Sequence, residues 1–136
     1  MTIAIISLLA TVVTVSLDPV GRFQQARDTT RWVDVSSIST AIHEYIVDND
    51  GSLPTGISTT EQQLGECASG GAAACAGAAD ACLDLSVILA KYLKSMPLDP
   101  NGGTLDTTGY SVVADSNNII TITACAAEIE TIEMSK

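Results

Sequence analysis

The first residues of this chain place the strongest constraint on how it can fold. The run from Thr2 to Leu17, "TIAIISLLATVVTVSL", is sixteen residues without a charge, and Asp18 and Pro19 follow it. As a helix it spans about 24 Å, which is slightly short of the ~30 Å thickness of the hydrocarbon core of a bilayer. It lacks the basic start and the cleavage pattern of a secretory signal peptide. Its hydroxyl-bearing and small side chains suit a helix that contacts both lipid and other helices.

A helical pattern continues from Val20 to about Asp48. Nothing in this stretch breaks a helix, so we expect one helix of nearly fifty residues, with Pro19 at a kink. The sequence "DNDGSLP" supplies the residues that end a helix. One apolar stripe recurs at steps of three and four, which predicts a face packed on a sheet; it comprises Trp32, Val35, Ile38, Ile42 and Tyr45. We therefore expect an apolar stem over residues 1–24 and a globular head over residues 25–136.

The charges are strongly biased toward acid. Six Lys and Arg stand against sixteen Asp and Glu, for a net charge of −10. Nucleic-acid binding requires a basic surface that releases counterions, so this composition argues against it. Arg22, Arg27 and Arg31 follow the apolar run closely. They could bind an acidic lipid headgroup, but we expect them to pair with acids of neighbouring subunits, because an acidic protein needs such pairs to pack against itself.

Four cysteines, Cys67, Cys75, Cys82 and Cys125, give an even number in a small chain. Zinc sites favour pairs separated by two to four residues, whereas seven and six residues separate the first three cysteines here. We therefore expect two disulfides and an oxidising compartment. Three pairings are open from sequence alone; we favour one bridge within residues 67–82 and one that ties this segment to Cys125.

The rest of the chain predicts an α+β fold. Residues 55–82 indicate a long loop that the disulfides would staple. Apolar residues at helical spacing over 85–93 predict a short second helix with Asp84 as its N-cap. The β-branched runs "TGYSVVAD" and "NIITITACA" flank Ser116 and Asn117 and predict a hairpin, and "ETIEMS" predicts a third strand. We expect a three-stranded antiparallel sheet on the stripe of the long helix.

Five segments resemble type IV pilins and the pseudopilins of type II secretion. They are the apolar stem, the "ARD" turn, the Trp- and Asp-bearing stripe with the exit "AIHEYIVDNDGSLP", the stretch "YLKSMPLDPNGGTLDTTGYSV", and the tail "ITITACAAEIETIEMS". The resemblance spans most of the chain except residues 55–82, and it implies the pilin fold. Family members begin with an aromatic residue and carry a glutamate a few residues later. Here the first acid is Asp18, so alignment on "AII" places the start about seven residues late.

The resemblance implies a structural subunit of an extracellular, type IV pilus-like filament, for adhesion, motility or DNA uptake. Such a subunit sits in the inner membrane before assembly, is processed by a prepilin peptidase, is handled by pilus assembly machinery, and becomes part of a helical homo-oligomer at the cell surface. The alternatives are a pseudopilin of a secretion system and a membrane-tethered binding module. The expected assembling residues are those of the stem: Ala4, Ser7, Leu8, Ala10, Thr11, Val13, Thr14, Leu17 and Pro19.

Residues that could support chemistry are sparse. His43 has no cysteine or second histidine near it in sequence, so a packing role is expected. Asp99, Asn101 and Asp106 form a weak calcium candidate, because they lack the spacing of an EF-hand loop. The resemblance makes a calcium site here only slightly more plausible, and a turn with solvated carboxylates is the simpler interpretation. We expect no catalytic site and no cofactor.

Overall fold

The structure, a computed structural model, describes residues 19–136. Pro19 is the first residue of its long helix, α2 (Pro19–Asp48). The other residues expected in the assembling stem lie outside the described residues: Ala4, Ser7, Leu8, Ala10, Thr11, Val13, Thr14 and Leu17. Within residues 19–136, no helix combines the length and apolar character needed to cross a membrane.

Helix α2 forms and ends as its sequence predicts. Val35, Ile38 and Ile42 are fully buried on one side, as a stripe at helical spacing requires. At its end the N–H of Gly51 donates to the carbonyl of Ile46, and Gly51 takes a left-handed φ of 85°. Glycine adopts that conformation without a steric cost. The prediction that Trp32 belongs to the buried stripe is wrong: 38% of Trp32 is exposed, because it turns to the side, where its indole nitrogen donates to Glu130.

The sheet has five strands in the order β2-β1-β3-β4-β5. They are β1 (Gln62–Leu64), β2 (Ala79–Leu83), β3 (Tyr110–Ala114), β4 (Ile120–Ala124) and β5 (Glu133–Ser135). The three expected strands are present as β3, β4 and β5, and they pair antiparallel. The prediction of a three-stranded, wholly antiparallel sheet is wrong, because β1 pairs with β3 and adds β2 in parallel. The sheet is therefore mixed.

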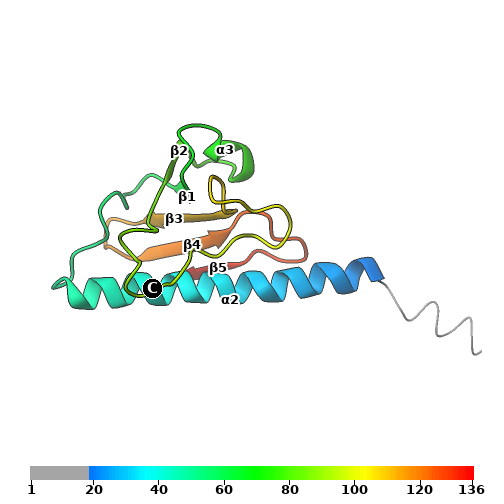
Figure 1. Cartoon of the computed structure of the whole chain (residues 1–136), viewed down its shortest axis with the longest axis horizontal. Coiled ribbons are helices and arrows are strands. Elements are labelled where there is room, and N and C mark those ends of the chain that lie inside the picture. The colour runs from blue at the N-terminus through cyan, green and yellow to red at the C-terminus, as the bar shows by residue number, and fades with distance from the viewer. Residues whose placement is uncertain (1–18) are drawn as a thin grey trace, which may run out of the picture.

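The core lies between α2 and the sheet. Ile120, Ile122 and Ala124 alternate along β4 and are buried, as the period-two geometry of a strand dictates, and α2 packs on β4 and β5. In Figure 1 the strands run from β2 and the short helix α3 (Gly71–Ala74) at the top to β5 beside α2 at the bottom. The opposite side of α2 is left without a layer of the described chain.

Two further predictions of local structure are corrected. Residues 55–82 contain β1, α3 and β2 instead of a continuous loop. Residues 85–93 form turns instead of a helix, although Leu89 donates to Leu85 and Leu93 to Leu89 through their backbones. Leu85 and Leu89 are still fully buried. The apolar spacing thus correctly identified residues that are buried in the core, but it wrongly predicted that their backbone is helical.

The disulfides match the arrangement that the sequence favoured. Cys67 pairs with Cys82 within the segment around α3, and Cys75 pairs with Cys125 just after β4. All four cysteines are therefore bonded. The first bridge closes the α3 segment on itself, and the second fastens this segment to the sheet.

Candidate functional site

A buried ionic cluster joins α2 to two distant loops. The guanidinium of Arg31 is fully buried; its Nε and Nη2 donate to the two carboxylate oxygens of Asp99 at 2.7 and 3.0 Å. Its Nη1 donates to Asp28 at 2.8 Å and to Glu128 at 2.9 Å. The hydrogen bonds to Asp99 are the main cause that raises the pKa of Arg31, so this cation stays charged. The planar fork of arginine suits such paired contacts.

The same cluster fixes the loop between β4 and β5. Asp28 accepts the backbone N–H groups of Glu128 and Ile129 at 3.1 and 2.8 Å. Burial raises the pKa of Asp28, but these bonds and Arg31 outweigh it, and the net shift is downward. Glu128 also accepts two bonds from Arg27 at 2.7 Å. The bonds from Arg27 and Arg31 lower the pKa of Glu128 to about 2.

This cluster corrects the role expected of two arginines. Arg27 and Arg31 were expected to reach acids of neighbouring subunits, yet both bind carboxylates of their own subunit. Arg31 has no exposed surface with which to reach a neighbour. Arg22 differs, because it is exposed and makes no ion pair within residues 19–136. Arg31 is therefore excluded from contacts between subunits, Arg27 keeps 30% of its side chain exposed beside Glu128, and Arg22 is the most accessible candidate of the three.

The weak calcium candidate is also corrected at Asp99. Both of its carboxylate oxygens bind Arg31, and one also accepts the backbone N–H of Asn101 at 2.8 Å. A carboxylate already neutralised by a buried guanidinium is a poor ligand for a cation. Asn101 and Asp106 are exposed. Across residues 19–136, no group of three His, Cys, Asp or Glu side chains is arranged to hold a metal ion.

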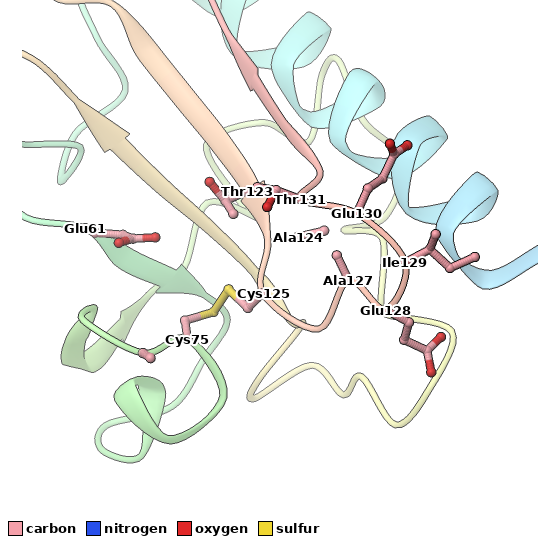
Figure 2. Close-up of a pocket in the computed structure, with 11 residues that line it drawn as sticks. Glu61, Cys75, Thr123, Ala124, Cys125, Ala127, Glu128, Ile129, Glu130 and Thr131 are labelled. Atoms are coloured by element: carbon pink, nitrogen blue, oxygen red, sulfur yellow. A yellow bond between two sulfur atoms is a disulfide. The ribbon is translucent and has the colours of Figure 1, made fainter. Parts of the chain in front are cut away.

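An open groove of about 550 Å³ lies beside the β4–β5 loop. Figure 2 shows Glu61, the Cys75–Cys125 disulfide and Thr123 around it, with Glu130 on the loop. Glu61 accepts the hydroxyl of Ser111. No histidine lines the groove, and both sulfurs are in a disulfide. The groove therefore presents carboxylates and hydroxyls but no activated nucleophile.

The side of α2 that faces away from the sheet has an unusual composition. We call it the outer face of α2. Between its ends it carries small, hydroxyl-bearing or apolar side chains and no charge. Its members, at helical spacing, are Arg22, Ala26, Thr29, Thr30, Val33, Ser37, Thr40, Glu44 and Val47. Val33 is 60% exposed and Val47 is 79% exposed.

Three of the four hydroxyls of the outer face are turned back onto the helix. Thr29 donates to the carbonyl of Gln25 at 2.9 Å, Thr30 to Ala26 at 3.2 Å, and Ser37 to Val33 at 2.9 Å. A hydroxyl satisfied by its own backbone presents mainly carbon to an approaching surface. The outer face is therefore less polar than its composition suggests.

Two adjoining hollows lie over the C-terminal half of the outer face. One has about 390 Å³ and includes His43, Val47 and Lys136; the other has about 270 Å³ and includes Ser37 and Leu93. Thr40, Glu44 and Tyr92 line both. His43 bonds to the carbonyl of Ser39 at 2.7 Å, a local contact that fits its expected packing role. The helix surface here is grooved rather than flat, which suits the packing of another helix.

Comparison with protein-family models, curated proteins and solved structures finds no match for this chain.

Sequence analysis missed the ionic cluster because its members are far apart in the chain. Arg31 and Asp99 are 68 residues apart, and Arg31 and Glu128 are 97 residues apart. One signal was available: Arg31 lies one helical turn from Asp28 and on the edge of the apolar stripe. A charge at such a position must find a partner when the stripe is buried.

Proposed function

We propose that this protein is a structural subunit of a type IV pilus-like filament that polymerises through its N-terminal helix. The supporting observation is the outer face of α2, which has no charge from Ala26 to Thr40 and follows the uncharged run of residues 2–17, with Asp18 and Arg22 between them. A helix that one sheet covers normally shows charged residues to solvent on its other side. In a chain with a net charge of −10, this face is suited to contact with protein.

The occupant we propose is the apolar run of further copies of this chain. Residues 2–17 carry no charge and contain small and hydroxyl-bearing side chains. Helices of this kind associate through close packing and sparse polar contacts rather than through large apolar side chains. The outer face of α2 has the same character, so the two surfaces are compatible. Repetition of this contact from copy to copy is open-ended and builds a filament.

A single charge in the apolar run tests this function. In the full chain expressed with its assembly machinery, Ala10→Asp should abolish filaments, counted by negative-stain electron microscopy. An acidic side chain in that run costs on the order of 2.5–3.5 kcal/mol at a bilayer centre, and in a filament the penalty recurs in every subunit. The head should keep its fold, which disulfide mapping and circular dichroism would report.

Ala73→Asp is the matched control. It introduces the same side chain at an exposed position of α3, at the end of the molecule far from α2 (Figure 1), and should leave filament number unchanged. Normal filaments from Ala10→Asp would show that the apolar run does not mediate assembly, and the proposed function would fail.

A further inference from the structure

The outer face of α2 carries two charges of opposite sign, one near each end. Arg22 lies near the start of the helix and Glu44 near its end, and both are exposed. Every other charged side chain of α2 binds a side chain of the same subunit. The pairs are Arg27 with Glu128, Arg31 with Asp28 and Asp99, Asp34 with Tyr110, and Asp48 with Lys91. Arg22 and Glu44 form no ion pair within residues 19–136.

The spacing of these two charges defines a length. They lie 22 residues apart, which corresponds to about six turns and about 33 Å along the helix axis. Since 22 residues are close to a whole number of turns, both side chains project from the same side. A second, parallel copy of α2 displaced by this length would bring its Arg22 opposite Glu44 of the first.

We propose that Arg22 of one subunit pairs with Glu44 of another, so that this pair sets an axial offset of about 33 Å between the two helices. The proposal rests on the proposed function, because it assumes that the outer face of one subunit meets the apolar run of another in a filament. The contact uses Arg22 of one subunit and Glu44 of the other. Each subunit therefore keeps its second charge free to pair with a further subunit. Such heterologous contacts propagate without closing on themselves when the operation is a translation with rotation.

Few basic side chains are left for contacts between subunits. Of the six Lys and Arg in the chain, Arg27, Arg31 and Lys91 already bind acids of their own subunit, which leaves Arg22, Lys94 and Lys136. Arg22 alone of these lies on α2, whereas Lys136 lines a hollow beside Glu44 of its own subunit. Subunits that otherwise repel one another can be held in one alignment where opposite charges meet. Charge complementarity at an interface fixes register and rejects wrong alignments more than it adds affinity. At this offset the uncharged stretch between Arg22 and Glu44 faces the residues that precede Arg22 in the next copy, of which residues 2–17 also carry no charge.

A charge swap tests the pairing. In the full chain expressed with its assembly machinery, Arg22→Glu should place two acids opposite each other, and Glu44→Arg two bases. Each single variant should lower the number of filaments by about tenfold or more, because like charges at an interface are strongly unfavourable. The double variant Arg22→Glu with Glu44→Arg should restore filaments. Normal filaments from either single variant, or no recovery in the double variant, would overturn the pairing.

Cross-linking supplies an independent readout. A double variant Arg22→Cys with Glu44→Cys, treated with a short bis-maleimide, should give covalent ladders of subunits, because all native cysteines are bonded. A linker is used since an arginine–glutamate pair holds its backbones farther apart than a disulfide permits. The control Arg22→Cys with Ala73→Cys should give no ladder, and equal ladders in both would overturn the pairing. If the wild-type chain forms no filaments the proposed function itself fails, whereas wild-type filaments with a failed swap reject the pairing alone.

Discussion

Arg31 shows how one side chain can specify the contacts of three segments. It lies on α2, and its guanidinium binds Asp99 in the loop before β3 and Glu128 in the loop after β4. Removing these charges from water is costly, and the cost is offset only where every donor finds an acceptor. Within residues 19–136, no buried side-chain nitrogen or oxygen lacks a hydrogen-bond partner. The cluster therefore fixes where the loops dock rather than adding a large net stability.

The variant Arg31→Met tests this view at the level of one residue. It keeps apolar volume but leaves Asp99 buried without its cation, so the free energy of unfolding should fall by about 3–5 kcal/mol. Urea unfolding of the full chain in detergent, followed by Trp32 fluorescence, would measure it. The double variant Arg31→Met with Asp99→Asn should recover part of the loss, because an amide oxygen still accepts the Asn101 N–H. A double variant less stable than Arg31→Met would contradict this account.

Glu128 should make stability depend on pH in the acid range. Its pKa in the folded protein is about 2, against an ordinary value of 4.5, because Arg27 and Arg31 bind its charged form. Between these values the unfolded chain binds a proton that the folded chain does not. The contribution of Glu128 is therefore complete above about pH 4.5 and is lost as the pH falls toward 2. The lowered pKa of Asp28 acts in the same direction, and the raised pKa of Asp34 opposes it.

Urea unfolding measured from pH 5 to pH 2 would test this dependence. The variant Glu128→Gln should lose stability more gradually as the pH falls through that range, since its amide does not titrate. Identical pH profiles for the variant and the wild type would show that Glu128 does not contribute.

At the scale of elements, the disulfides hold β1 and β2, whose sequences have little preference for strand, in the sheet. Strands β1 and β2 read "QQL" and "ADACL" and contain no β-branched residue, so local propensity for strand is weak. Gln63 is fully buried and bonds through both ends of its amide, to the carbonyl of Gly71 and the N–H of Gly109. These long-range bonds and the two bridges provide what the local sequence does not.

The two disulfides should differ in their contributions to stability. Cys67–Cys82 closes 15 residues and Cys75–Cys125 closes 50. The loss of chain entropy in the unfolded state increases with loop length, giving about 3 and about 4 kcal/mol respectively. Paired Cys→Ala variants, compared by urea unfolding of the full chain in detergent, should rank in that order. The reverse order would show that native contacts around α3, rather than loop closure, dominate.

At the scale of the whole molecule, the two sides of α2 differ in what they contact. Its inner side packs on β4 and β5, whereas its outer face is largely exposed, with Tyr92, Leu93 and Lys136 beside its C-terminal half. The remaining surface is acidic and discourages indiscriminate contact between copies. This layout concentrates the surface suited to self-association on one helix and supports the assembly proposed above.

The sequence alone determined the features that depend on local pattern. Helical spacing from Val35 to Ile42 identified the buried side of α2, "DNDGSLP" identified its end, and β-branched runs around Ser116 and Asn117 identified the β3–β4 hairpin. Each arises from residues close in the chain, whose backbone preferences and apolar periodicity act without help from distant segments.

Only the tertiary structure decided the rest. It showed that Arg27 and Arg31 belong to an internal cluster, because their acids lie on loops about a hundred residues away. It added β1 and β2 to the sheet through pairing with β3 and through disulfides, and it replaced the expected helix at 85–93 with turns whose leucines reach the same core. In each case, contacts between distant residues outweighed a local preference that is worth less than about 1 kcal/mol per residue.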